Sequence, residues 1–393
     1  MTIEQIVNDA DLRSRLFPVT RRKTFLAHAG VAPITQRAVE RIRMAAEEGA
    51  SQEQETEALL REIEESRQVA ARLLQADPTE IALVGPTAFG LNLVAQGIDF
   101  RPGDEVVFYP DDYPANVYPW MRLAERGVKL VRLEPDTLGQ LTPELVLEAV
   151  GPRTRLVALA SCHFLSGYLL DYRTIGAELR RRGVLFCLDG IQSLGAAPMD
   201  AAYCDFLSAD SHKWLLGPLG AGIFYVRKER QDLLRPALVG AWNIRSPGFI
   251  AQPQIECEAG ARRYECGALY ALGILGMRAS IELLLELGIE AIRERLLSLH
   301  AFLAEGLRKR GWRLLAEEFP EEARSGIVTA THDRIDLAAG VRLLKEQEIV
   351  VSLRWDRQGK PYLRFSPHFY NTHAELAKAV GVLDRGAFPG VSR

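Results

Sequence analysis

The chain has 393 residues, of which 48% are apolar and 25% are charged, and its formal net charge is −3. This length exceeds that of an ordinary single domain, and the composition predicts a globular protein with a large core. The small net charge gives no reason to expect nucleic acid or an anionic membrane as a partner.

The first part of the chain is predicted to be mainly helical. Residues 1–25 are polar and basic with one helical patch. Apolar residues recur at helical spacing over residues 36–48 and 57–75. Asp77-Pro78 ends the second helix, and residues 81–84 form a short strand.

Strands and helices then alternate. The predicted strands are residues 106–109, 129–133, 156–160 and 184–188, and the predicted helices are 119–126, 143–150 and 174–182. Short apolar strands separated by helices predict a mostly parallel sheet with helices on both faces. The ligand crevice of such a sheet lies beyond the carboxyl ends of its strands.

The pattern changes after residue 280. Helices are predicted over residues 281–287, 289–310 and 338–347, and strands over 327–331 and 349–353. This mixture indicates a smaller α+β domain. We therefore expect three parts: an N-terminal segment 1–25 that packs on the small domain, a large α/β domain 26–280, and a small C-terminal domain 281–393.

The spacing of the cysteines and the length of the apolar runs indicate the cellular compartment of the protein. Neither a C-x-x-C pair nor a small disulfide-rich chain is present, so we expect no metal site and a reducing cytosol. The N-terminal sequence lacks the apolar region of a signal peptide. No apolar run approaches the roughly 20 residues of a membrane helix. The expected location is cytoplasmic. The five cysteines are Cys162, Cys187, Cys204, Cys257 and Cys266.

Lys213 lies just past a predicted strand, residues 205–209, and a second strand resumes at residue 223 after several glycines. A lysine at a strand end beside a histidine can act as an imine-forming amine, although a lone lysine is usually a solvated surface residue. Asp189 likewise follows the strand 184–188. On its own it could equally cap a helix.

Two motifs together resemble a known family. Ser211-His212-Lys213, with Asp189-Gly190-Ile191-Gln192 upstream, resembles the class V aminotransferases, which include cysteine desulfurases, selenocysteine lyases, kynureninases and isopenicillin N epimerase-like proteins. The resemblance extends from about His28 to Thr372. It implies fold type I of the pyridoxal-phosphate (PLP) enzymes, with PLP as the cofactor.

The resemblance implies roles around the cofactor ring. Lys213 would supply the amine, and Asp189 would keep the ring nitrogen protonated, so that the ring accepts the electrons left when a bond at Cα breaks. Gln192 would hydrogen-bond the ring hydroxyl. Tyr113, where many members have histidine, would stack on the ring face.

Other residues would bind the phosphate and the substrate. The turn from Gly85 to Ala88 lies between a strand and a helix, where free N–H groups and the helix dipole favour an anion. Thr87 and Ala88 would therefore bind the phosphate, and the resemblance implies that His212 is a second phosphate donor. By resemblance, Arg364 would grip the α-carboxylate of an amino acid substrate, and His28 would line the substrate pocket.

The chain departs from the family pattern in three places. Residues 350–362 contain no cysteine, whereas desulfurases carry a nucleophilic cysteine there, so persulfide chemistry of that type is not expected. Ala268 stands where the partner subunit normally offers a hydroxyl to the phosphate. Phe164 stands near the cofactor where many members have Asn.

The family also implies a homodimer with active sites at the interface. Residues 238–267 would reach across to the partner subunit. Trp242, Phe249 and Tyr264 would serve as aromatic anchors, because aromatic residues are enriched in interface cores.

Several functions remain open. We expect an aminotransferase that acts on a small amino acid. A PLP-dependent C–S or β-lyase, or an amino-acid epimerase, is the alternative, because all three reactions begin with proton loss at Cα. A non-catalytic binding protein of the same fold is a further alternative. A nicotinamide dehydrogenase and a P-loop enzyme are disfavoured, because neither glycine-rich phosphate motif is present in the required context.

Overall fold

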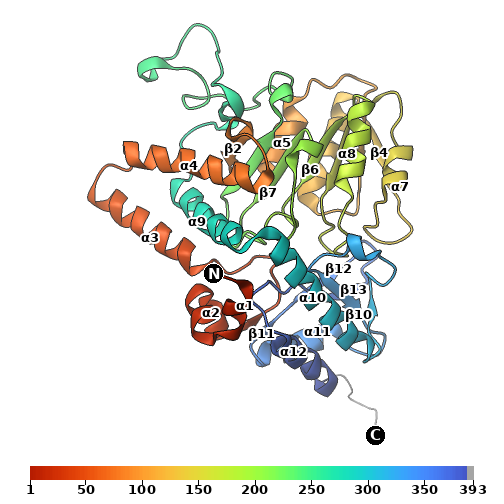
Figure 1. Ribbon diagram of the computed structural model, residues 1–393. Helices are drawn as coiled ribbons and strands as arrows, with labels where there is room; N and C mark the ends of the chain where they lie inside the picture. The colour runs from red at the N-terminus through yellow and green to blue at the C-terminus, as the bar shows by residue number, and fades with distance from the viewer. Residues whose placement is uncertain (387–393) are drawn as a thin grey trace.

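A seven-stranded sheet forms the centre of the large domain in the computed structural model, which describes residues 1–386 (Figure 1). Its strands pair in parallel, except that β8 runs antiparallel to both of its neighbours. This confirms the predicted mostly parallel sheet. In spatial order the strands are β2 (Ile81–Val84), β8 (Gly222–Val226), β7 (Phe206–Asp210), β6 (Leu185–Asp189), β5 (Thr154–Ala160), β3 (Glu105–Phe108) and β4 (Lys129–Arg132).

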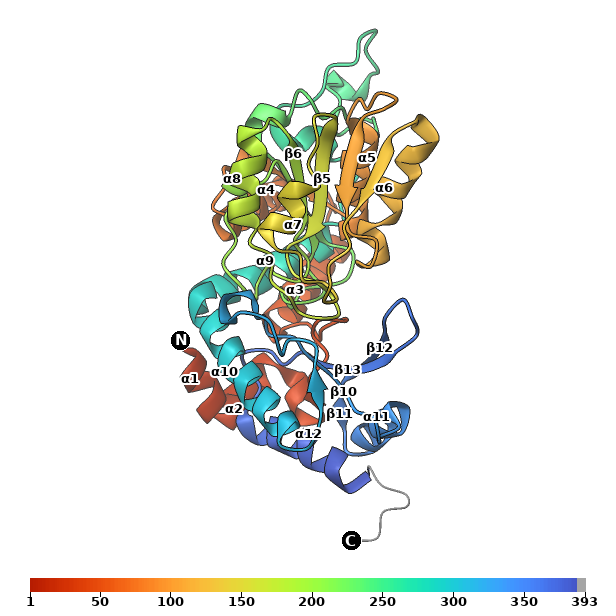
Figure 2. The ribbon, with the colours of Figure 1, turned by 90° about the vertical axis from the view of Figure 1, so that its right-hand side faces the viewer.

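Helices cover both faces of this sheet, as Figure 2 shows. Successive residues of a strand point to opposite faces. Phe186 and Leu188 of β6 accordingly join the apolar layer on the side of α4, whereas Leu185 and Cys187 join the layer on the side of α5. The first layer contains α4 (Glu57–Leu74), α7 (Pro143–Glu148), α8 (Tyr172–Arg181) and α9 (Ala271–Leu287), and the second contains α5 (Thr87–Gly97) and α6 (Tyr118–Arg122).

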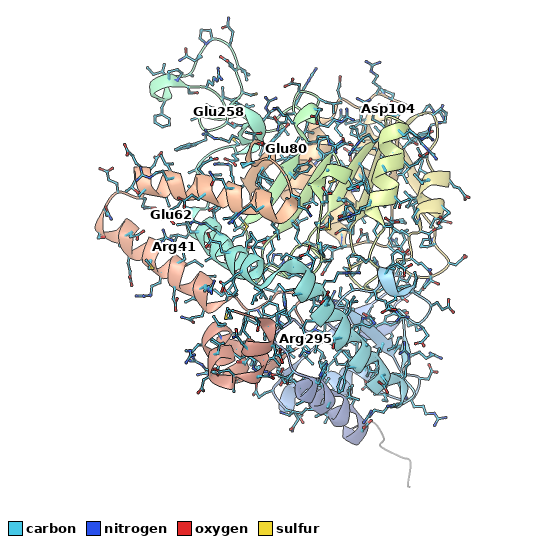
Figure 3. The ribbon with its side chains drawn as sticks, viewed as in Figure 1. Arg41, Glu62, Glu80, Asp104, Glu258 and Arg295 are labelled. Carbon is cyan, nitrogen blue, oxygen red and sulfur yellow. The ribbon has the colours of Figure 1, made fainter. Side chains whose placement is uncertain are left out.

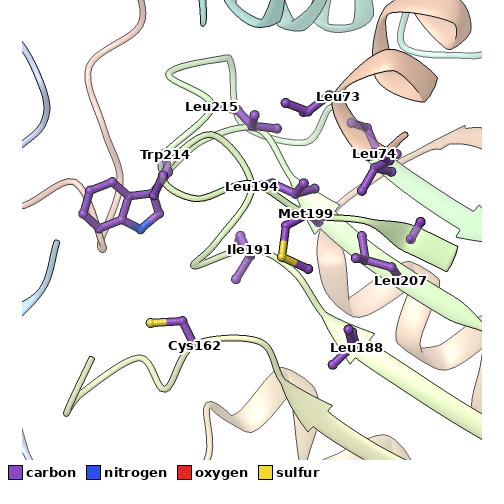
Figure 4. Close-up of a cluster of buried hydrophobic side chains, with 14 of the residues drawn as sticks. Leu73, Leu74, Cys162, Leu188, Ile191, Leu194, Met199, Leu207, Trp214 and Leu215 are labelled. Carbon is purple, nitrogen blue, oxygen red and sulfur yellow. The ribbon is translucent and has the colours of Figure 1, made fainter. Parts of the chain in front are cut away.

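The core under the strand ends is closely packed. Leu73 and Leu74 of α4, Leu207 of β7 and Leu188 of β6 belong to one buried apolar cluster, and Trp214 lies at its edge (Figure 4). Trp214 is fully buried, although it directly follows Lys213 in a loop. The segment that carries Lys213 is therefore anchored in the core of the large domain.

The smaller domain is built on a four-stranded antiparallel sheet with the order β12-β13-β10-β9. Residues 387–393, the end of the predicted small domain, lie outside the described residues. The elements of this domain are β9 (Arg313–Leu314), β10 (Val328–Thr331), β12 (Ser352–Trp355), β13 (Pro361–Phe365), α10 (Ile289–Arg308), α11 (Leu337–Glu346) and α12 (His373–Gly386).

The N-terminal segment contacts the small domain. It contains α1 (Ile3–Asn8), α2 (Ala10–Leu16) and β1 (Thr24–Phe25), which pairs in parallel with β11 (Ile349–Val350). The ring of Phe17 stacks on Tyr370 with centroids 4.1 Å apart. Arg13 Nη1 lies 3.5 Å from the Glu375 carboxylate. Strand pairing, stacking and charge together attach this segment to the small domain.

The long helix α9 begins at Ala271, well before the predicted start at residue 281, and it continues through the predicted domain boundary. Gly273 and Gly276 weaken the helical signal of this stretch, because glycine is a poor helix former. Gly276 serves packing instead. A Cβ there would lie 2.6 Å from the side chain of Ile42 on α3 (Gln36–Ser51).

Charged side chains tie the helices of the large domain together. Arg41 Nε of α3 donates to Glu62 Oε2 of α4 at 3.0 Å, and both residues are labelled in Figure 3. Over residues 1–386, none of the helices combines the length and the apolar character of a membrane span. The same residues include no group of three or more His, Cys, Asp or Glu side chains placed to hold a metal ion.

A buried ion pair fixes α4 to the edge of the large sheet. Arg67 Nε donates to Glu265 Oε1 at 3.1 Å, and its Nη2 donates to Oε2 at 2.5 Å. The backbone N–H of Leu83, on edge strand β2, donates to the same carboxylate at 2.7 Å. Burial raises the pKa of Glu265, and Arg67 opposes this shift.

We expect Arg67→Met to lower the free energy of unfolding by about 3–5 kcal/mol, because it leaves Glu265 buried without a countercharge. The shift in urea midpoint measures this. Arg43→Met is the matched control, since Arg43 and Glu47 form an exposed i,i+4 pair worth about 0.3–0.5 kcal/mol. Equal midpoint shifts in the two variants would contradict the prediction.

Candidate active site

A cavity of about 440 Å³ opens at the carboxyl ends of the central parallel strands, where the small domain meets the large one. Most of the predicted site residues line it, and residues from β12 and β13 complete its wall. The lining residues are Ala29, Gly30, Val31, Pro86, Thr87, Ala88, Tyr113, Ala115, Phe164, Asp189, Ile191, Gln192, His212, Lys213, Arg354 and Arg364.

Lys213 is a buried amine in this cavity, with 6% of its surface exposed. Its Nζ lies 5.1 Å from the centroid of the Tyr113 ring. Burial lowers the pKa of Lys213 to about 8, Asp189 opposes this shift, and Arg364 and Arg354 reinforce it. An appreciable fraction of the amine is therefore neutral, and hence nucleophilic, near neutral pH.

Asp189 is the last residue of β6, and its side chain is buried. Its Oδ1 accepts a hydrogen bond from the N–H of Ile191 at 3.0 Å. Burial raises the pKa of Asp189 to about 6, against the opposing effects of that N–H and of Lys213. A cationic ring nitrogen would supply the charge that this carboxylate requires in order to stay ionised.

The N-terminus of α5 forms the end of the cavity suited to a phosphate. The first N–H groups of a helix lack acceptors within it, and Pro86 at the N-cap supplies no side-chain bond. Thr87 Oγ1 accepts from the N–H of Asp210 at 2.9 Å, so its own hydroxyl hydrogen remains free to donate. His212 Nδ1 lies 2.9 Å from Asp210 Oδ1.

Gln192 is held in one orientation. Its Nε2 donates to the carbonyl of Ala29 at 3.0 Å, and its Oε1 accepts from Trp214 Nε1 at 2.9 Å. One N–H of the amide remains for a ligand. Tyr113 is held from the other side, because the buried Asp112 carboxylate accepts its backbone N–H at 2.7 Å.

The structure does not place the side chain of His28, expected to line the substrate pocket, in the cavity lining. Its ring is fully buried, with Nδ1 2.8 Å from the carbonyl of Ser366 and Nε2 2.6 Å from the hydroxyl of Tyr370. The loop does reach the cavity, but through Ala29 and the residues after it. The resemblance of three residues, His28-Ala29-Gly30, predicts the position of the loop but does not predict which of its side chains points into the cavity.

Arg364 is almost completely buried on β13. Its Nη1 donates to the carbonyl of Phe164 at 2.5 Å, whereas Nε and Nη2 have no hydrogen-bond partner among the described residues. Burial and the nearby Arg354 lower the pKa of Arg364 to about 9. Unpaired donors on a buried cation require an anion, which fits a carboxylate ligand.

The positions at which the chain departs from the family pattern lie in different parts of the structure. Phe164 lines the cavity and packs edge-on against Tyr113, with centroids 5.6 Å apart. Ala268 lies in a separate surface hollow between α4 and α9. The cavity lining contains no cysteine. Arg354 is the lining residue that sequence reasoning missed, because only the pairing of β12 with β13 brings it beside Arg364.

The residues present fit PLP. One cavity, of the size typical for small ligands, contains four features that PLP and its substrate require. They are an amine with a lowered pKa, a buried carboxylate without a full countercharge, a helix N-terminus and a guanidinium with unpaired donors. The fold and the site are those of a PLP-dependent enzyme. The profile of the family described as aminotransferase class-V matches residues 24–378. The chain belongs to the class V aminotransferase family.

Curated relatives of this chain have different names. It is 31% identical to an isopenicillin N epimerase of Amycolatopsis lactamdurans over 81% of this chain and 83% of that protein. It is 29% identical to an uncharacterised aminotransferase of Bacillus subtilis over 80% and 81%. A probable cysteine desulfurase of Methanothermobacter thermautotrophicus is 31% identical, over 60% of this chain and 58% of that protein's length.

Solved structures share the fold. A cysteine desulfurase of Thermococcus onnurineus superposes with a TM-score of 0.88 at 22% identity, and the match covers 98% of both chains. The cystine C–S lyase C-DES superposes with a TM-score of 0.85 at 24% identity, over 94% of this chain and 100% of that one. At these identities the likeness concerns the architecture.

The lowered pKa of Lys213 predicts the pH dependence of cofactor uptake. Because only the neutral amine attacks an aldehyde, we expect the rate at which cofactor-free protein takes up PLP to rise with pH up to about 8 and then to level off. Stopped-flow absorbance at the violet edge measures this rate. Lys213→Ala, the control, should show no borohydride-fixed cofactor. A rate that keeps rising to pH 10 would contradict the buried-amine assignment.

Proposed function

We propose that this enzyme transfers the amino group of a small amino acid and that Arg364 binds the substrate α-carboxylate. The observation that carries the proposal is the placement of a buried amine, Lys213, close to Tyr113 in a cavity whose lining contains no cysteine. Persulfide formation in the desulfurase manner requires a thiol nucleophile. Amino-group transfer on bound PLP requires no thiol, because an amine can move the proton.

Each buried group has a separate task in this proposal. The chemistry that bound PLP supplies is an electron sink for the pair released at Cα. Asp189 would keep the ring nitrogen protonated, and the N-terminus of α5 with Thr87 and His212 would hold the phosphate. Lys213 would accept the proton from Cα of the substrate and act as the proton carrier of the transfer.

Two other reactions use the same first step. Return of the proton to the opposite face of Cα would give an epimer, and the likeness to an isopenicillin N epimerase over most of both chains favours this alternative. Loss of a substituent at Cβ would make the enzyme a lyase. These routes differ in the fate of one proton or one leaving group.

We expect an amino acid added without a keto-acid acceptor to release one equivalent of keto acid per site and to bleach the violet absorbance of the enzyme. Absorbance and keto-acid assays over a panel of amino acids measure this, with Lys213→Ala as the inactive control. Continuous keto-acid release with ammonia or a thiol would instead establish a lyase. Loss of optical activity without keto acid would establish an epimerase.

We also propose that the enzyme is a homodimer. Large apolar side chains are exposed on one side of the molecule, on α3, α4, the start of α9 and the segment 238–258, which stands out from the large domain (Figure 1). Two adjoining hollows of about 690 and 460 Å³ lie between these helices. Apolar patches of this kind typically mark interfaces. Examples are Met44, Leu60, Phe249, Ile255 and Tyr270.

One of the expected interface anchors has another role. Tyr264 is buried within its own subunit, where its hydroxyl donates to the carbonyl of Leu234 at 2.9 Å. It therefore anchors the segment at its base. Trp242 and Phe249 pack against each other with centroids 5.9 Å apart, and Phe249 is 70% exposed. This pair remains available to a partner subunit.

A cytoplasmic location is part of the proposal. The five cysteines are free thiols, and Cys257 and Cys266 are partly exposed. Such thiols persist in a reducing compartment.

We expect sedimentation to give a dimer, and we expect the double variant Met44→Asp with Tyr270→Asp to give folded monomers of low activity, because charge is placed in the apolar patch. Circular dichroism checks the fold. Phe302→Asp, on α10 outside this patch, is the control and should stay dimeric. A fully active wild-type monomer would refute the proposal.

A further inference from the structure

The strand pair β12–β13 presents two arginines on one face. These strands are antiparallel, with Ser352 opposite Arg364 and Arg354 opposite Tyr362. Side chains two positions apart share a face of a strand. Arg354 and Arg364 are therefore diagonal neighbours, at a spacing that long side chains readily bridge.

The two guanidinium groups converge on the same part of the cavity. Nη2 of Arg354 and Nη2 of Arg364 each lie 3.7 Å from the point where a Cβ on Gly30 would stand. The two nitrogens are thus within twice that distance of each other. Because Gly30 has no side chain, it leaves the space in front of both groups open.

Neither arginine is neutralised by an acidic side chain within the described residues. Arg354 is half-buried, and its Nη1 donates to the carbonyl of Leu353 at 2.9 Å. Arg364 has two buried donors without partners. Asp111 pairs with Arg357 at the turn of the same hairpin. Two close cations without a carboxylate between them destabilise the empty site and favour an anionic ligand.

The two guanidinium groups carry one positive charge more than a single α-carboxylate neutralises. The fork of Arg364 is sufficient for a bidentate carboxylate, which leaves Arg354 without a partner. We propose that Arg354 binds a second carboxylate of the substrate, so that the enzyme acts on amino dicarboxylic acids of the aspartate and glutamate type. This inference rests on the proposed function, in which Arg364 holds the α-carboxylate, and it names the substrate class.

Unreactive analogues test the double anion site without any turnover. Calorimetry on the PLP-loaded enzyme should show that succinate binds roughly 10- to 100-fold more tightly than butyrate. Succinate has a second carboxylate, which Arg354 would bind through a charged hydrogen bond. Arg354→Met should remove this difference, and Arg354→Lys should retain part of it. Arg357→Met, an exposed arginine on the same hairpin, is the control and should preserve it.

Kinetics provide the second readout. Arg354→Met should lower kcat/KM for glutamate roughly 10- to 100-fold more than kcat/KM for norvaline, mainly through KM. Equal binding of succinate and butyrate to the wild-type enzyme, or unchanged discrimination in Arg354→Met, would overturn the inference. If no amino acid is deaminated while the succinate preference still depends on Arg354, the reaction proposal fails and the second anion site stands.

Discussion

Charge burial is the constraint on which this active site depends. Lys213 and Arg364 are removed from water in a cavity to which the large domain contributes one lining carboxylate, Asp189. An uncompensated buried cation is costly, so either its pKa falls or an anion joins it. Both cations do show lowered pKa values. The same desolvation that favours the neutral form of the Lys213 amine also favours the binding of ligands that carry negative charge.

The fold produces this burial by bringing two domains together over the strand ends. Parallel strands place Asp189 at the end of β6 and Lys213 just beyond β7. The small domain then closes the cavity with Arg364, whose Nη1 reaches across to the carbonyl of Phe164. Backbone contacts keep this approach in register, as the N–H of His28 donates to the carbonyl of Ser366 at 3.1 Å. The cavity therefore exists only in the assembled fold.

The sequence predicted the parts of this arrangement that depend on strand alternation and strand ends. Strand alternation predicted the parallel sheet, and the family resemblance pointed to Asp189 and Lys213, which the structure places at and just beyond the ends of the neighbouring strands β6 and β7. The sequence did not give the direction of a side chain within a loop, and the side chain of His28 lies outside the cavity lining. It did not give the register of β12 against β13 either, and Arg354 becomes a neighbour of Arg364 only through that register. Tyr264, expected as an interface anchor, is buried in its own subunit, because aromatic residues anchor cores and interfaces alike.

In the proposed function, cofactor chemistry and substrate recognition are therefore carried by different domains. The groups suited to PLP follow the strands of the large sheet, whereas both arginines that converge beside Gly30 come from the β12–β13 pair of the small domain. A change in that strand pair would alter which anionic groups a substrate must carry while leaving Lys213 and Asp189 in position. Relatives named as epimerase, aminotransferase and desulfurase are compatible with such a division. A common electron sink permits several reactions, and the residues that hold the substrate over it decide which bond at Cα is aligned to break.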